Sequence, residues 1–211
     1  AKVVVNDLGG EVDGDGESTK FADRVAAAIE EAGGEAVANY GSVTDEAEAQ
    51  EMVEQAVDAF GALDIVVNNA GILRDKTLVK MTRDMWDPVI DVHLTGTYLV
   101  TRAATRKMME LGEPGRIINT TSLAGLLGNF GQTNYGAAKA GIAGITRTVA
   151  LEGRKFGITV NAIAPVAKTR MTEDIDAVPT EMEPEDVSPL VTWLASDEAE
   201  DVTGRIFGAH G

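Results

Sequence analysis

The chain has 211 residues, 44% of them apolar and 25% charged, with no cysteine, two histidines and a formal net charge of −16. This length fits one domain with a substantial core, and the composition excludes disulfides, thiolate metal sites and a histidine-rich metal site. The negative charge argues against nucleic acid and anionic membrane surfaces as partners, and no apolar run approaches the length of a bilayer span. We therefore expect a globular cytoplasmic protein that holds no metal.

Strands and helices alternate in the first third of the chain. The sequence KVVVN at residues 2–6 is typical of a buried parallel strand and is followed directly by Asp7. After a polar loop over residues 11–19, we expect a helix over 21–32 that ends at a pair of glycines, and a strand over 35–39. Residues 46–60 are predicted as a helix that Thr44 or Asp45 caps, and residues 63–67 as a strand that leads into the sequence NNAG.

The alternation continues to the end of the chain. Residues 72–80 are predicted as a loop with three basic side chains, and a long helix from Thr82 to about residue 110 contains His93. A strand begins at Arg116, a helix covers 133–156, and a strand over 158–163 is ended by Pro165. A helix over 186–196 and a last strand that begins at residue 205 complete the chain. This pattern predicts an α/β fold with a doubly wound parallel sheet of the Rossmann type in a single domain.

Residues 115–147 contain the strongest chemical signal. Tyr135 and Lys139 lie four positions apart at the beginning of the predicted helix, so they share one face. Ser122 follows the end of a strand, where a parallel sheet presents its functional groups. A cation beside a phenol favours the phenolate and lowers its pKa, and a nearby hydroxyl can orient a substrate oxygen. The pattern indicates an acid–base site, although a tyrosine and a lysine at this spacing also fit an exposed helix surface.

Several motifs together resemble the short-chain dehydrogenase/reductase family. They are NNAG at residues 68–71, Ser122 thirteen positions before Tyr135, and NAIAP at residues 161–165. Further stretches are similar to the (3R)-hydroxyacyl-CoA dehydrogenase unit of peroxisomal multifunctional enzymes and its bacterial relatives, and the resemblance covers essentially the whole chain. These stretches are VVVNDLGG, GGEAVANY, NNAGILRD, VHLTGTYLVTRAA, GNFGQTNY and ALEGRKFGI.

The resemblance implies catalytic roles for four residues. Tyr135 is the expected general acid and base, Ser122 orients the substrate oxygen, and Lys139 lowers the tyrosine pKa and holds the nicotinamide ribose. The wider family usually has asparagine at the position of His93, whereas the multifunctional branch tends to have histidine there. A proton-relay role and a simple packing role are both open for His93.

The same resemblance implies an NAD site. Asp7 is expected to accept hydrogen bonds from the adenosine ribose hydroxyls, and its charge would repel the 2′-phosphate of NADP. The backbone at Ala70 and Gly71 would approach the cofactor, and Thr169 would touch the nicotinamide amide. The expected cofactor-binding residues are Asp7, Asn69, Ala70, Gly71, Tyr135, Lys139, Pro165 and Thr169.

Parts of the family pattern have no counterpart in the sequence. The family's first strand, glycine-rich turn and following helix, a unit of about 30 residues, do not precede residue 1, and the chain stops soon after the last strand. We therefore expect residues 1–211 to be one dehydrogenase domain that is truncated at both ends. The missing strand would lie between the strand that precedes Asp7 and the strand that ends at Val67.

The leading functional prediction is an NAD-dependent oxidoreductase that interconverts a 3-hydroxyacyl-CoA and a 3-oxoacyl-CoA by hydride transfer. Its partner is then a small acyl thioester, which a short acidic lid over residues 171–185 would admit, and family members usually form homodimers or homotetramers through their long helices. One alternative is a 3-oxoacyl-carrier-protein reductase, which Asp7 opposes because those relatives commonly use NADPH. The other is a non-catalytic dinucleotide-fold subunit that serves assembly, which the intact Ser122, Tyr135 and Lys139 oppose.

Overall fold

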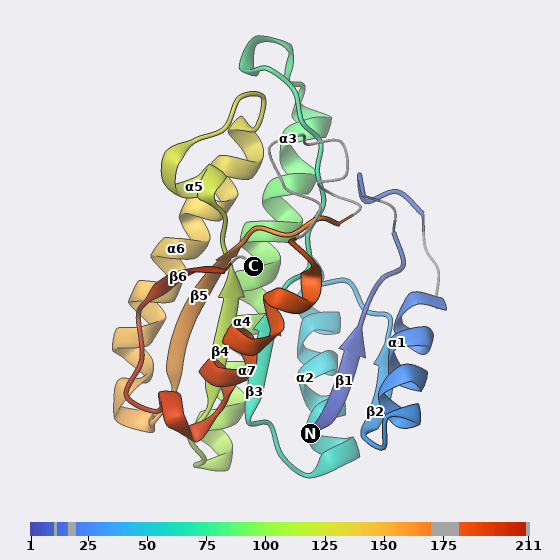
Figure 1. Ribbon diagram of the computed structural model, residues 1–211, viewed down its shortest axis with the longest axis vertical. Helices are drawn as coiled ribbons and strands as arrows, with labels where there is room; N and C mark the ends of the chain where they lie inside the picture. Colours follow the sequence, from blue (N-terminus) through green and yellow to red (C-terminus); the bar gives the residue numbers. More distant parts are fainter. Residues whose placement is uncertain (11, 17–19, 170–181, 210–211) are drawn as a thin grey trace.

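Parallel strands form two separate hydrogen-bonded ladders in the computed structural model, which describes residues 1–10, 12–16, 20–169 and 182–209 (Figure 1). The two-stranded ladder pairs β1 with β2, and the four-stranded ladder has the order β3-β4-β5-β6. The strands are β1 (Lys2–Asn6), β2 (Glu35–Asn39), β3 (Ile65–Asn68), β4 (Arg116–Thr120), β5 (Thr159–Pro165) and β6 (Ile206–Ala209). The parallel α/β fold class is therefore confirmed. Within the described residues, no ladder joins β1 to β3.

Helices connect the strands, as expected for parallel pairing. The α-helices are α1 (Lys20–Glu31), α2 (Glu46–Phe60), α3 (Arg83–Ile90), α4 (Gly96–Leu111), α5 (Leu123–Leu127), α6 (Thr133–Gly153) and α7 (Ser188–Ala195). Short 3₁₀ turns occupy Leu78–Lys80, Arg154–Phe156, Pro184–Asp186 and Asp197–Ala199. None of the described helices is long and apolar enough to cross a membrane.

The ends of α2 show why its boundaries could be predicted. The Asp45 carboxylate accepts hydrogen bonds from the backbone N–H groups of Ala47 and Glu48, which would otherwise lack partners in the first turn. At the other end, Gly61 has a φ of 78°, the left-handed conformation that commonly closes a helix and that glycine adopts without strain. Both ends lie where the sequence placed them.

The long helix predicted from Thr82 to about residue 110 is wrong in one respect. A π-helical segment, Asp91–Thr95, interrupts it and separates α3 from α4. A π turn places an extra residue in the helix and often marks a functional site. Here the interruption contains His93, whose buried side chain lies near the predicted active site.

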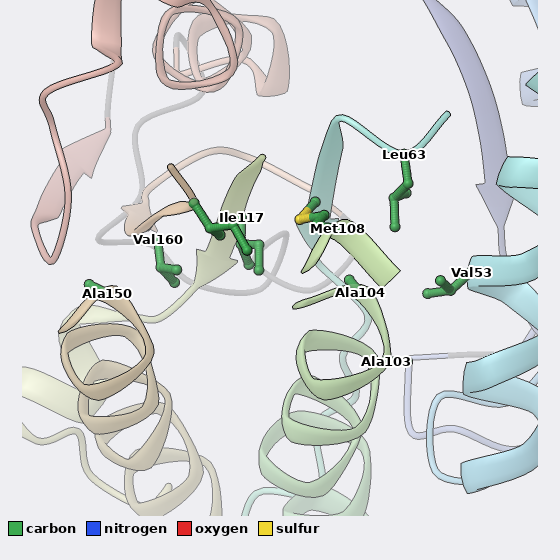
Figure 2. Close-up of a cluster of buried hydrophobic side chains, with 9 residues drawn as sticks. Val53, Leu63, Ala103, Ala104, Met108, Ile117, Ala150 and Val160 are labelled. Atoms are coloured by element: carbon green, nitrogen blue, oxygen red, sulfur yellow. The ribbon is translucent and has the colours of Figure 1, made fainter. Parts of the chain in front are cut away.

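The core has two layers because β4 and β5 are covered on both faces. Ile117 packs with side chains of α4 and α6, and the next residue, Ile118, packs with side chains of α7. Successive strand residues point to opposite faces, so these helices cover opposite sides of the four-stranded ladder. Figure 2 shows the larger cluster, to which α2 also contributes. Its buried members are Val53, Leu63, Ala103, Ala104, Met108, Ile117, Ala150, Ile158 and Val160.

Candidate active site

The carboxyl ends of the parallel strands bring several predicted site residues to one edge of the molecule. Asp7 follows β1, Asn69 follows β3, Ser122 comes two residues after β4, and Pro165 ends β5. Parallel α/β sheets bind ligands at this edge, because every strand delivers its next loop there. The edge is therefore the candidate active site.

Ser122 and Lys139 come together because α5 packs closely against α6. The Ser122 hydroxyl caps α5 by accepting a hydrogen bond from the Ala124 N–H at 3.2 Å. A Cβ at Gly125 would lie 2.6 Å from the Ala140 nitrogen and 2.8 Å from the Lys139 Cβ, so only glycine fits at this crossing. The sequence analysis assigned no role to Gly125 and missed α5, which is five residues long.

Tyr135 lies in the first turn of α6, half-buried between Ser122 and Lys139. The Ser122 hydroxyl is within hydrogen-bonding reach of the phenol, and the Lys139 Nζ is 5.4 Å from the ring centroid. Burial raises the pKa of Tyr135, the hydrogen bond from Ser122 lowers it, and the charge of Asp75 raises it. We expected a lowered pKa, and this expectation is wrong for the structure, because the cost of burying a phenolate outweighs the favourable contacts.

Lys139 is only 3% exposed and is held at both its side chain and its backbone. Its Nζ donates to the Thr120 carbonyl at 2.6 Å, and the Thr121 hydroxyl donates to the Lys139 carbonyl at 2.7 Å. Burial lowers the pKa of the ammonium to about 7. Thr120 and Thr121 thus position the lysine from the end of β4 and the residue after it, a contribution that the sequence did not reveal.

His93 is 1% exposed and contacts the Tyr135 ring edge-on, with the two ring centroids 5.1 Å apart. Its Nε2 lies 3.1 Å from the Ile72 nitrogen and 2.8 Å from the Ile72 carbonyl, whereas its Nδ1 is buried without a hydrogen-bond partner. Burial, and then the charge of Lys139, lower the pKa of His93 to about 3, so the ring is neutral near pH 7. A Cβ at Gly71 would lie 2.4 Å from His93 Cε1, which shows that this glycine also makes room for the imidazole.

The other predicted cofactor residues lie along the same edge. Asp7 is exposed, and its Oδ1 accepts a hydrogen bond from the Gly9 N–H at 2.6 Å. The Asn69 side-chain Oδ1 accepts from the Thr120 hydroxyl at 3.2 Å, and the neighbouring Ala70 is exposed. Pro165 is half-buried and Thr169 is exposed.

Two further expectations concern the predicted lid over residues 171–185 and the basic loop over 72–80. Most of the predicted lid over residues 171–185 lies outside the described residues. Arg74, one of the three basic side chains of the loop over 72–80, binds the Asp13 carbonyl and the Asp15 carboxylate at 2.7 and 2.8 Å. Its charge is thus engaged by the loop that follows β1. In the described part of the chain, no group of three or more histidine or acidic side chains could hold a metal ion.

Comparisons with known proteins agree with this geometry. The family model described as short chain dehydrogenase matches residues 14–179. A short-chain type dehydrogenase/reductase of Mycobacterium tuberculosis is 52% identical over 203 residues, which are 95% of this chain and 71% of that protein. The peroxisomal hydratase-dehydrogenase-epimerase of Saccharomyces cerevisiae is 50% identical over 98% of this chain. The peroxisomal multifunctional enzyme type 2 of Mus musculus is 48% identical over 97% of it.

The chain spans only 23% of the yeast protein and 28% of the mouse protein. A crystal structure of a short chain dehydrogenase from Mycobacterium avium superposes with a TM-score of 0.88 at 49% identity and covers 100% of this chain and 74% of that one. The resemblance inferred from the sequence motifs is confirmed by these relatives. The chain belongs to the short-chain dehydrogenase family of oxidoreductases.

Proposed function

We propose that this chain carries the active site of an NAD-dependent dehydrogenase that interconverts 3-hydroxyacyl-CoA and 3-oxoacyl-CoA. The cluster of Ser122, Tyr135 and Lys139 supports this proposal best, since it brings a hydroxyl, a phenol and a buried ammonium together at the carboxyl edge of the sheet. The substrate class is supported by the relatives whose printed names include a dehydrogenase within a peroxisomal multifunctional protein. It also follows the sequence resemblance given above.

Proton transfer is the part of the reaction that the chain's own residues perform. In the oxidation, the substrate 3-hydroxyl loses its proton to the Tyr135 oxygen while the Ser122 hydroxyl holds the same substrate oxygen. Bound NAD supplies the acceptor for the hydride that leaves C3, so the products are the 3-oxoacyl thioester, NADH and one proton. In the reduction, the Tyr135 phenol returns the proton. In its protonated form Lys139, whose Nζ is 5.4 Å from the ring centroid, would favour the phenolate that the oxidation needs and so oppose the effect of burial.

His93 contributes to this proton transfer as a neutral imidazole. A ring with a pKa of about 3 does not change its charge near neutral pH, so a relay through it uses the neutral tautomers. The buried Nδ1 without a protein partner fits such a role, because an ordered water usually satisfies a buried polar atom of this kind. The N–H and C=O of Ile72 both face Nε2, so this nitrogen has a hydrogen-bond partner at Ile72 in either neutral tautomer.

The residues along the strand edge fit a dinucleotide at its two ends. Asp7 presents an exposed carboxylate after β1, which suits the ribose hydroxyls of NAD and disfavours the extra phosphate of NADP. By the family resemblance, Lys139 would hold the nicotinamide ribose, and Pro165 would be among the residues that line the cofactor. Exposed Asn69 and Ala70 leave the backbone between these ends accessible.

Steady-state kinetics of the full-length protein test this proposal. With a 3-hydroxyacyl-CoA as substrate, we expect kcat/KM with NAD to exceed that with NADP by about tenfold or more. A preference for NADPH and a carrier-protein thioester would instead favour the 3-oxoacyl-carrier-protein reductase. A folded protein that turns over neither substrate would overturn the dehydrogenase proposal in favour of a non-catalytic assembly subunit.

We further propose that the protein assembles as a homodimer or homotetramer through α4 and α6. Apolar side chains are exposed on the outer surfaces of these helices: Tyr98 and Met109 on α4, and Leu151 on α6, which is 71% exposed. Light scattering tests the assembly. We expect a dimer or larger species for the native protein and a smaller one for Leu151→Asp, and a monomeric native protein would contradict the proposal.

A further inference from the structure

The beginning of α6 is fastened to the loop that follows β3. Three consecutive residues of this loop, Arg74 to Lys76, each bond to the segment of residues 131–134 that precedes Tyr135. The Lys76 N–H donates to the Gly131 carbonyl at 2.8 Å, the Gln132 Nε2 donates to the Asp75 Oδ2 at 2.7 Å, and the Asn134 Nδ2 donates to the Arg74 carbonyl at 3.0 Å. Tyr135 is the next residue along the chain, so these bonds fix the turn that carries it.

Gln132 has an unusual position in this fastening. It is the N-cap residue of α6 and its carbonyl accepts the first helical hydrogen bond, from the Gly136 N–H at 2.7 Å. An N-cap side chain often bonds to the helix backbone, but the side chain of Gln132 does not. Gln132 is almost fully buried. Its side-chain Nε2 donates to Asp75, and its side-chain Oε1 accepts from the Asn129 Nδ2 at 2.9 Å.

Asp75 is the acidic group that this arrangement holds at the turn that carries Tyr135. The other groups that face the phenol are Lys139 from the same helix, His93 from the π-helical segment and the Ser122 hydroxyl. Of these, His93 is neutral and Lys139 can carry a positive charge, whereas the Asp75 carboxylate supplies a negative one. Its charge raises the pKa of Tyr135. Asp75 itself remains exposed to solvent, and partial desolvation raises its own pKa while the Gln132 bond lowers it.

We propose that Asp75 is a positioning residue of this active site: its carboxylate fixes the beginning of α6 through Gln132, three positions before Tyr135, and brings a negative charge to that turn. The inference rests on the proposed function, because it takes Tyr135 to be the proton carrier. The two effects act in different ways. The hydrogen bond determines where the phenol stands, and the charge determines the pH at which the phenol ionises.

Asp75→Asn separates the two effects. Asparagine has nearly the same shape and keeps an oxygen that can accept the Gln132 hydrogen bond, but it carries no charge. Without the carboxylate, the Tyr135 phenolate forms at lower pH, so the acidic limb of the pH profile of kcat for the oxidation moves to lower pH. Well below the midpoint, we expect kcat to rise about threefold, the order for one carboxylate that water partly screens. Asp84→Asn is the matched control, since it removes one exposed carboxylate from the first turn of α3.

Gln132→Ala tests the hydrogen bond. This variant keeps the Asp75 charge but removes the contact, so we expect kcat to fall about tenfold with a smaller displacement of the acidic limb than in Asp75→Asn. Thermal melts of each variant show whether the fold is intact. Unchanged kcat and KM in Gln132→Ala would overturn the positioning effect.

An ultraviolet titration of the phenolate gives a readout that needs no turnover. The chain has three tyrosines, and subtracting the titration of Tyr135→Phe isolates the signal of Tyr135. We expect its midpoint to lie lower in Asp75→Asn than in the native protein and in Asp84→Asn. Identical midpoints in all three proteins would overturn the charge effect. Full activity of Tyr135→Phe would instead overturn the proposed function, whatever the midpoints are.

Discussion

Two asparagine pairs of matching geometry join parallel strands, one pair in each ladder. Asn6 Nδ2 donates to Asn39 Oδ1 between β1 and β2, and Asn68 Nδ2 donates to Asn119 Oδ1 between β3 and β4, both at 2.8 Å. Each pair occupies the last position at which its two strands pair with one another. The surroundings differ, because Asn68 and Asn119 are 9% and 0% exposed whereas the first pair is only half-buried.

The buried pair also reaches further into the molecule. Asn68 donates to the Thr101 hydroxyl of α4, and Asn119 donates to the Thr146 hydroxyl of α6, both at 2.9 Å. This chain of hydrogen bonds holds the two large helices against the strands that lead to Asn69 and Ser122. The other pair bonds to the Gly41 carbonyl and to Gln55 of α2, closer to solvent. An asparagine pair at the strand ends is thus buried beside the active site in the four-stranded ladder and partly exposed in the two-stranded ladder.

The largest effect is expected for a substitution at the active site, beside the four-stranded ladder. Tyr135→Phe removes the hydroxyl that carries the proton but keeps the ring, so turnover of the full-length protein should fall by about 100-fold or more. The thermal melt should change little, because the Phe ring fills the same space and keeps its edge contact with His93. Activity within a few-fold of the native value would remove Tyr135 from the mechanism.

The asparagine pairs themselves predict a difference in stability. Asn119→Ala leaves Asn68 and Thr146 with buried polar groups that lose a partner, and each such group costs about 1–3 kcal/mol. Asn39→Ala breaks the equivalent bond to Asn6, but water can replace it there, so the free energy of unfolding should fall by about 1 kcal/mol or less. Chemical denaturation of both variants makes the comparison. Equal losses would show that burial does not distinguish the two ladders.

The proposed preference for NAD over NADP depends on Asp7, which follows β1 of the two-stranded ladder. Asp7→Ala removes the carboxylate that would repel a 2′-phosphate, so the preference for NAD over NADP should narrow by about tenfold, or 1.4 kcal/mol. Asp58→Ala is a suitable control, since it removes an exposed carboxylate from the last turn of α2, at the opposite end of this helix from the strand-end edge. Kinetics with both cofactors provide the measurement. A preference that does not change in Asp7→Ala would place the ribose elsewhere.

Much of the fold could be predicted because its strands are short apolar runs with clear turn residues around them. The boundaries of β1, β2 and α2 agree with those predicted from the sequence. The π-helical segment could not be predicted, since its sequence DVHLT has no break signal and is compatible with a continuous helix. The five-residue α5 is too short for periodicity to reveal it.

The candidate site divides in the same way. Ser122, Tyr135 and Lys139 follow from spacing on a strand end and a helix face, which a sequence displays directly. The pKa of Tyr135 depends on burial, which the sequence does not give. The predicted direction of its pKa shift was therefore wrong. The bond between Asp75 and Gln132 joins residues 57 positions apart, and only the fold brings them together.

The smallest expected effect is a pH dependence of stability from His93. The ordinary pKa of histidine is 6.5, and burial together with Lys139 lowers that of His93 to about 3 in the folded protein. As the pH falls below 6.5 the unfolded chain therefore takes up a proton that the folded protein refuses, and stability is lost progressively until the pH nears 3. Between about pH 6.5 and 5.5 this loss amounts to about 1 kcal/mol.

His93→Asn removes this contribution while keeping a side chain that can bond to Ile72. Carboxylates also contribute to acid unfolding, but they do so equally in both proteins, so the difference between the two Tm curves isolates the histidine. We expect the Tm of His93→Asn to fall a few degrees less than that of the native protein over this range. Parallel curves would mean that the imidazole takes up its proton without unfolding, and hence that the active site is more open at His93 than its burial indicates.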